Sequence, residues 1–198
     1  MTPSGPPLPP PRPVIGILHP GVMGAALGTA LRATAGAVIW ADAGRTHATA
    51  KRAEIADLVA VPDVGALARR ADVVVSVCPP DAALAVAREV AAGLADRVGG
   101  PPLYVEANTV APGTVREIAA LLGPWTVCDA AIIGPPSRTA GTTEILLAGP
   151  GAAAVAGLFA GSVFGTSVLG TGPDDVGRAS ARATGPTSHG RHAGDTAR

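Results

Sequence analysis

The chain has 198 residues, of which 47% are hydrophobic, 15% are charged and 3% are aromatic, and its formal net charge is zero. This length accommodates one ordinary domain with a sizeable core. Because basic residues do not outnumber acidic ones, nucleic acids and anionic membranes are not expected as partners. With no run of 18 apolar residues and no signal-peptide pattern, we expect a cytoplasmic protein with no membrane association.

Regular elements are predicted to begin after a proline-rich stretch. Residues 1–12 hold too many prolines for a helix or a paired strand, so we expect a disordered, extended tail, with a proline-rich ligand for another domain as the alternative. Beyond it, apolar periodicity predicts strands at 14–18, 37–41, 72–78, 102–107, 125–130, 143–148 and 163–169, and a short segment at 58–61. The predicted helices span 22–33, 46–57, 63–70, 81–95, 112–122 and 151–160.

The periodic pattern stops after Gly170. Residues 171–198 show no helical or strand period and almost no large apolar residue beyond Val176. A segment of this composition cannot bury enough surface to fold alone, so we expect a disordered or irregular tail. The predicted folded domain therefore spans residues 13–170.

The most informative stretch is 14–31, where a short apolar strand leads into a glycine turn and then a helix of small residues. Gly21 lets the backbone approach an anion, and Gly24 and Gly28 let the helix lie close to the sheet. The N–H groups at the start of such a helix face a phosphate. The dinucleotide pattern G-x-G-x-x-G is incomplete because His19 holds its first position, so an ordinary β-to-α turn is the alternative.

The following elements favour the dinucleotide interpretation. The β-α-β-α-β order is that of a mononucleotide-binding half-sheet, and the β-branched run at 72–78 is typical of a parallel strand buried on both faces. We therefore predict an α/β fold of the Rossmann type, with a doubly wound, mostly parallel sheet and helices on both faces.

Five short motifs occur in order: H-P-G-V-M-G (19–24), S-V-C-P-P (76–80), E-A-N-T-V-A-P (106–112), D-A-A-I-I-G-P-P (129–136) and G-T-T-E-I-L-L-A-G (141–149). Together they resemble motifs of the β-hydroxyacid dehydrogenase superfamily, which includes 6-phosphogluconate dehydrogenase, 3-hydroxyisobutyrate dehydrogenase and imine reductases. The resemblance covers about residues 14–180. It implies an N-terminal NAD(P)-binding domain of an oxidoreductase that transfers hydride to or from a small hydroxyacid, carbonyl or imine.

The resemblance and the predicted strand ends indicate where the cofactor would bind. The phosphates would lie on the turn at 19–24, whereas Pro79, Asn108 and Thr109 follow carboxyl ends of strands and would frame the nicotinamide. Asn108 and Thr109 alternatively cap the helix that begins near Pro112. The predicted cofactor-binding residues are His19, Pro20, Gly21, Val22, Met23, Gly24, Asp42, Arg45, Thr46, Cys78, Pro79, Asn108 and Thr109.

The end of the second predicted strand carries conflicting signals about the cofactor. Asp42 is placed where a carboxylate binds the ribose hydroxyls of NAD, whereas G-R-T (44–46) resembles the family's N-R-T, whose Arg meets the 2′-phosphate of NADP. Charge repulsion from Asp42 favours NAD, and the family pattern with Arg45 favours NADP. We favour NADP.

The chain also departs from the family pattern. The family's catalytic Lys aligns with Ala183, beside Arg182, and Lys51 is the only lysine of the chain. A guanidinium does not release its proton near neutral pH, so Arg182 replaces that Lys poorly and no catalytic residue is assigned. Ile133 occupies the family's substrate-contacting Ser position. We expect that the gene product is truncated or frame-shifted before the family's helical C-terminal domain.

Cys78 and Cys128 lack metal-ligand spacing and are predicted to be core thiols. His189 and His192 are predicted to be solvated, so we predict no metal site.

Besides the oxidoreductase, two functions stay open: a catalytically inactive dinucleotide-binding module, and a domain for another adenine nucleotide. The expected partners are a small-molecule substrate and, through an apolar face, a second copy of the chain.

Overall fold

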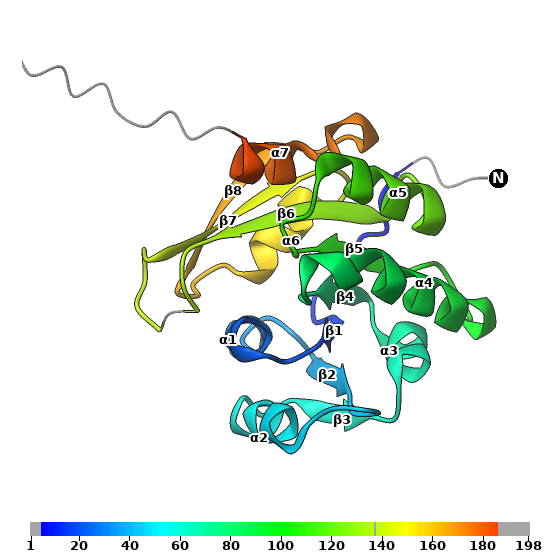
Figure 1. Ribbon diagram of the computed structural model, residues 1–198, viewed down its shortest axis with the longest axis vertical. Coiled ribbons are helices and arrows are strands. Elements are labelled where there is room, and N and C mark those ends of the chain that lie inside the picture. The colour runs from blue at the N-terminus through cyan, green and yellow to red at the C-terminus, as the bar shows by residue number, and fades with distance from the viewer. Residues whose placement is uncertain (1–4, 137, 186–198) are drawn as a thin grey trace, which may run out of the picture.

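The structure is a computed structural model, and it describes residues 5–136 and 138–185. One eight-stranded sheet has the order β3-β2-β1-β4-β5-β6-β7-β8 (Figure 1). The strands are β1 (Val14–Leu18), β2 (Ala37–Ala41), β3 (Val59–Val61), β4 (Val73–Ser76), β5 (Leu103–Glu106), β6 (Val127–Ile133), β7 (Thr143–Ala148) and β8 (Phe164–Gly170).

Strands β1 to β6 are parallel, and β7 and β8 run in the opposite direction, since β7 pairs antiparallel with β6 and parallel with β8. The α-helices are α1 (Val22–Leu31), α2 (His47–Ile55), α3 (Val64–Arg70), α4 (Ala83–Gly93), α5 (Pro112–Leu122), α6 (Ala152–Leu158) and α7 (Arg178–Thr184). Three single 3₁₀ turns are Pro80–Ala82, Leu94–Asp96 and Pro173–Asp175. The predicted mostly parallel α/β sheet is confirmed.

Helices cover both faces of the sheet, as predicted, and each face has its own hydrophobic core. On one face α1, α2 and α6 pack on side chains such as Ile15, Ile17 and Val105. On the other face α3, α4 and α5 pack on Leu18, Val74 and their neighbours (Figure 1). Alternation of the two sets along each strand explains why the strand sequences are apolar at nearly every position.

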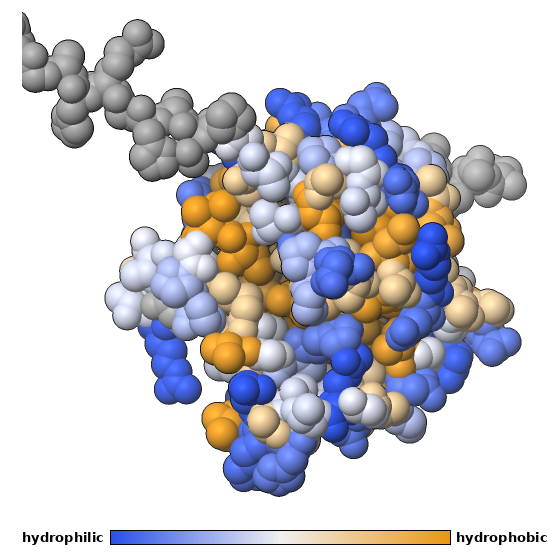
Figure 2. All heavy atoms as spheres, viewed as in Figure 1, coloured by the Kyte–Doolittle hydropathy of each residue, from blue (hydrophilic) through white to orange (hydrophobic). Residues whose placement is uncertain are grey.

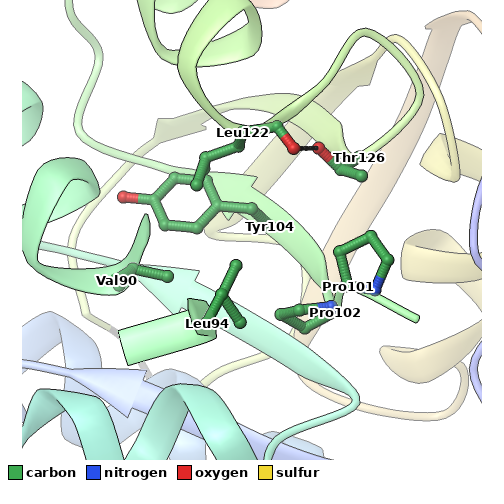
Figure 3. A pocket seen from close by; sticks show the side chains of 7 residues that line it. All are labelled: Val90, Leu94, Pro101, Pro102, Tyr104, Leu122 and Thr126. Atoms are coloured by element: carbon green, nitrogen blue, oxygen red, sulfur yellow. Dashed lines mark hydrogen bonds between the residues drawn. The ribbon is translucent and has the colours of Figure 1, made fainter. Parts of the chain in front are cut away.

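Small residues allow close contact between the layers. A Cβ added at Gly28 of α1 would lie 2.9 Å from Leu58, and one at Gly93 of α4 would lie 2.7 Å from the Cα of Gly65 in α3. Figure 3 shows the core at the start of β5, where the Tyr104 ring lies among Val90, Leu94 and Leu122. The scarcity of aromatic residues is thus compensated by close approach of backbones.

The segment after Gly170 differs from the prediction. It was expected to be irregular, yet it forms the 3₁₀ turn Pro173–Asp175 and α7, and Val176, Ala179 and Ser180 are buried. Ala179 packs on Ala131, Leu146 and Ala148 of β6 and β7. A short helix with little apolar surface is stable here because a buried carboxylate of the sheet holds its first turn, as described below. Residues 186–198 lie outside the described residues.

At the other end, residues 5–13 form neither helix nor strand. Arg12 joins this segment to the domain, donating a 2.8 Å hydrogen bond from Nη2 to the Ala35 carbonyl. Disorder of the segment 1–12 stays a prediction, and residues 1–4 lie outside the described residues.

The surface in this view is polar over α2, and apolar side chains reach it in the region between α7 and α1 (Figure 2). Among the described residues, no helix is both long and apolar enough to cross a membrane.

Candidate functional site at the switch point of the sheet

The turn between β1 and α1 has the geometry of a phosphate-binding turn. Gly21 donates its N–H to the His19 carbonyl at 2.7 Å and precedes the first residue of α1. A Cβ at Gly24 would lie 2.5 Å from the same carbonyl, so only glycine fits there. In contrast, a Cβ at Gly21 would meet no atom within 4 Å. The turn thus leaves open space on the side from which an anion would approach the helix N-terminus.

His19 occupies the position of the first glycine in the dinucleotide pattern and keeps a backbone conformation that suits glycine. Its φ is +66°, in the left-handed region, and only Asp57 and Thr109 share a positive φ among the described non-glycine residues. Its Nδ1 is buried and makes no hydrogen bond within the described part of the chain. Burial lowers the pKa of His19, and the nearby Arg45 guanidinium lowers it further.

The β2–α2 connection turns Arg45 inward and Asp42 outward. Gly44 has a φ of +71°, and Arg45 donates its N–H to the Asp42 carbonyl at 3.1 Å. Thr46 caps α2, because its Oγ1 accepts a 3.2 Å hydrogen bond from the Thr49 N–H. The Arg45 Nε is buried without a hydrogen-bond partner among the described residues. Arg45 is therefore a half-buried residue that takes part in no ion pair among the described residues.

Asn108 joins the carboxyl ends of β4 and β5. Its Oδ1 accepts a hydrogen bond from the Cys78 N–H, and its Nδ2 donates one of 2.9 Å to the Ser76 hydroxyl. The Asn108 N–H is donated in turn to the Glu106 carboxylate at 3.1 Å. With only 6% of its surface exposed, Asn108 acts here chiefly to position the Cys78–Pro79 segment. No helix cap from its side chain is present, because Ala111 is the N-cap of α5 and its side chain makes no capping hydrogen bond.

Two acids lie buried beneath this edge of the sheet. Burial raises the pKa of Glu106 to about 7, against a counteracting hydrogen bond from Asn108, and its Oε2 has no partner among the described residues. The neighbouring Asp129 is also buried and has a raised pKa, although it accepts hydrogen bonds from Ser180. Burial raises the pKa of the Cys78 thiol to about 11, which keeps it protonated at neutral pH.

These turns enclose a pocket of about 280 Å³ whose lining residues are His19, Gly21, Val22, Met23, Gly24, Arg45, Thr49, Val77, Cys78 and Pro79. It lies between the carboxyl ends of β1 and β4, where strand order changes direction. That switch point is where open α/β sheets bind their ligands. Sequence reasoning missed Thr49 and Val77 because neither belongs to a motif. The sequence could have indicated them by position, since Val77 directly follows β4 and Thr49 lies in the first turn of α2.

A second pocket, of about 510 Å³, lies beyond Arg45, and its lining residues are Ala41, Ala43, Arg45, Asp63, Val64, Gly65, Glu89, Ala92 and Gly93. Arg45 is common to both pockets and stands between them. Apart from Arg45, none of these residues was predicted as part of the site. The sequence signal for this pocket was the pair Gly65 and Gly93, which lie in close contact between α3 and α4 and line the pocket.

The remaining predicted site residues line neither pocket: they are Pro20, Asp42, Thr46, Asn108 and Thr109. Pro20 is buried within the turn, and Asp42 is exposed directly after the end of β2. Thr109 has a φ of +54° directly after Asn108. Whether these residues contact a cofactor stays a prediction.

Residues near the family's proton-donor position lie in α7. Ala183 packs against the small apolar cluster around Ala179, and Arg182 is exposed. Lys51 pairs with Glu54 on the surface of α2 at 2.9 Å. Within the described residues, no three His, Cys, Asp or Glu side chains form a group suited to a metal ion, and His189 and His192 lie outside those residues.

The likeness to known proteins lies in the fold. No family model matches the chain, and no curated protein matches its sequence. An imine reductase from Myxococcus stipitatus in complex with NADP⁺ is 25% identical with a TM-score of 0.67, over 86% of this chain and 58% of that one. A variant of an imine reductase from the same organism, in complex with NAD⁺, is 24% identical with a TM-score of 0.64, again over 86% and 58%.

The same holds for 3-hydroxyisobutyrate dehydrogenase from Mycobacterium tuberculosis, which is 19% identical with a TM-score of 0.68, over 87% of this chain and 58% of that one. The chain has the fold of the hydroxyacid dehydrogenases and imine reductases. It spans about three fifths of the length of these structures. The resemblance inferred from the five motifs is thereby confirmed at the level of the fold.

Proposed function

We propose that this chain is the dinucleotide-binding part of an NAD(P)-dependent oxidoreductase acting on a small hydroxyacid, carbonyl or imine. The observation that carries the proposal is the pocket at the switch point, where a glycine turn, a helix N-terminus and an arginine with no ion-pair partner among the described residues converge. Solved structures of the same fold hold NAD⁺ or NADP⁺, which supports this assignment.

The residues present fit a dinucleotide. The open space beside Gly21 gives the diphosphate access to the N–H groups at the start of α1, and α1 has no acidic residue in its first turn that would repel it. Cys78 and Pro79, fixed by Asn108, form the wall against which a nicotinamide would rest. When bound, the nicotinamide supplies the hydride, and the protein supplies orientation.

We further propose that NADP is preferred over NAD. Arg45 stands between the two pockets and its Nε lacks a partner, as expected of a group that meets a phosphate. Asp42, the residue that would bind the ribose hydroxyls of NAD, lines neither pocket. Asp42 therefore does not compete with a 2′-phosphate for Arg45, while Asp63 and Glu89 line the second pocket on the far side of Arg45.

A catalytically inactive dinucleotide-binding module is the second candidate. It is favoured by Ala183, which stands in α7 at the position of the family's catalytic Lys. The two candidates differ in turnover: a binding module holds the reduced cofactor without oxidising it when small ketones, imines or 2-oxoacids are added.

Titration of NADPH and NADH into the purified chain, followed by nicotinamide fluorescence, tests the function. We expect binding of both, with NADPH the tighter. Arg45→Ala should weaken NADPH binding by about 10–100-fold, the value of a charge-assisted hydrogen bond, and leave NADH little changed. Arg116→Ala, an exposed change on α5, is the matched control. Equal losses for both cofactors contradict the NADP preference, and binding of neither contradicts the function.

A further inference from the structure

His19 is a non-glycine residue in a strained backbone conformation. A φ of +66° strains any residue that carries a Cβ, and glycine adopts it freely. The conformation is imposed by the turn, because the His19 carbonyl accepts the Gly21 N–H and lies against the Cα of Gly24. Glycine would therefore suit the backbone better than histidine. Strained residues of this kind concentrate at functional sites.

The side chain of His19 shares a pocket with Arg45. Both line the 280 Å³ space over the phosphate turn, and both contain a buried nitrogen without a partner among the described residues. Arg45 is close enough to disfavour a charge on His19. No Asp or Glu lines the same pocket. Two groups able to carry positive charge thus converge on one space that holds no counter-charge, an arrangement suited to an anion.

We propose that the His19 imidazole is a phosphate-binding group of the dinucleotide site, acting with Arg45 on the phosphates of the bound cofactor. This inference rests on the proposed function and adds to it a residue that the glycine-rich pattern lacks. The imidazole then replaces contacts that backbone alone supplies at a glycine turn, and the strain at φ +66° is offset by that contact when the cofactor is bound.

The proposal links cofactor binding to a proton. In the free protein the pKa of His19 lies below its ordinary value, because burial and Arg45 disfavour the charged ring while the Leu18 carbonyl acts in the opposite direction. An adjacent phosphate favours the charged ring, so the pKa rises on binding and a proton is taken up. Binding is therefore tightest at low pH and weakens as pH rises through the pKa of the bound state. Of the other ionisable groups lining the pocket, Arg45 stays charged and Cys78, with a pKa of about 11, stays neutral over pH 5.5–8.5.

Two variants separate a binding role from a structural one. His19→Gly removes the imidazole and the strain and restores the glycine pattern. His19→Asn keeps a hydrogen-bonding side chain that tolerates the left-handed conformation but cannot titrate. Their NADPH affinities are measured by fluorescence at pH 5.5, 7 and 8.5, with thermal unfolding midpoints measured in parallel.

We expect His19→Gly to raise the unfolding midpoint and weaken NADPH binding about tenfold at pH 5.5. We expect His19→Asn to bind with a smaller pH dependence than the wild type. The 2′-phosphate of free NADPH titrates equally in all three experiments, so its contribution cancels in this comparison. Wild-type affinity and pH dependence retained by both variants overturn the inference and leave the proposed function standing. Failure of the wild type to bind NADPH or NADH overturns both.

Discussion

At the scale of single residues, Glu106 has a displaced acid–base equilibrium that makes stability depend on pH near neutrality. It is 1% exposed, one carboxylate oxygen has no partner among the described residues, and burial raises its pKa from 4.5 to about 7. The folded state therefore holds a proton that the unfolded state releases between pH 4.5 and 7, and stability falls as pH rises through this window.

Glu106→Gln should remove this loss of folding stability at neutral and higher pH. The amide stays neutral and keeps an oxygen that accepts the Asn108 N–H, so the variant should exceed the wild type in stability above pH 7, by up to about 3 kcal/mol. Below pH 4.5 the difference should vanish, because both side chains are then neutral. Urea unfolding at pH 4 and pH 8 measures it. A wild type more stable than the variant at pH 8 contradicts the assignment of a costly buried charge.

At the scale of elements, the attachment of α7 to the sheet depends on one buried carboxylate. Asp129 in β6 accepts a 2.9 Å hydrogen bond from the Ser180 N–H and a 2.6 Å bond from the Ser180 hydroxyl. Both residues are fully buried, so each bond is made without competition from water. The helix is thus stabilised at its first turn by a charge from a strand 51 residues away.

Ser180→Ala should loosen α7 specifically. It removes the hydroxyl partner of a buried carboxylate, at a cost of about 1–3 kcal/mol. Amide hydrogen exchange should show faster exchange in α7, with β1 and β4 changed less. Arg182→Ala, on the exposed side of the same helix, is the control and should change stability by no more than about 0.5 kcal/mol. Unchanged exchange in α7 would show that Asp129 does not anchor this helix.

The contact between α3 and α4 makes a second prediction for an element. A Cβ at Gly93 would lie 2.7 Å from the Cα of Gly65, so the two helices must separate to admit it. Gly93→Ala should destabilise the chain by about 1–3 kcal/mol. Gly157→Ala in α6, where the Cβ meets no atom within 4 Å, should stabilise it by about 0.5–1 kcal/mol. Urea unfolding compares them, and equal effects would contradict the close packing.

The sequence was sufficient for elements with strong local patterns. The apolar runs of β1, β4 and β5 and the turn at 19–24 could be read directly, and their order predicted the sheet. It was insufficient for α7, since that helix has few apolar residues and its anchor, Asp129, is distant in sequence. Arg45 was predicted as a site residue, but the second pocket that it lines was missed, because that pocket forms where α3, α4 and the end of β2 meet.

At the scale of the whole molecule, the eight-stranded sheet has the candidate site at one of its ends. The pocket, Arg45 and the Asn108 link all lie at the carboxyl ends of the parallel strands. Toward the opposite end, the Tyr104 ring packs among Val90, Leu94 and Leu122 (Figure 3). Self-association stays a prediction, which sedimentation equilibrium would test.

Gly21→Ala tests whether a dinucleotide binds over the turn from His19 to Gly24. The added methyl group meets no atom of the protein within 4 Å and φ is −66°, so folding should be unchanged or stabilised by up to about 1 kcal/mol. The same methyl group would occupy the space needed by a diphosphate. In a fluorescence titration with NADPH, Gly21→Ala should bind at least about tenfold more weakly than the wild type and the Gly157→Ala control. Equal affinities for the three proteins would contradict binding over this turn.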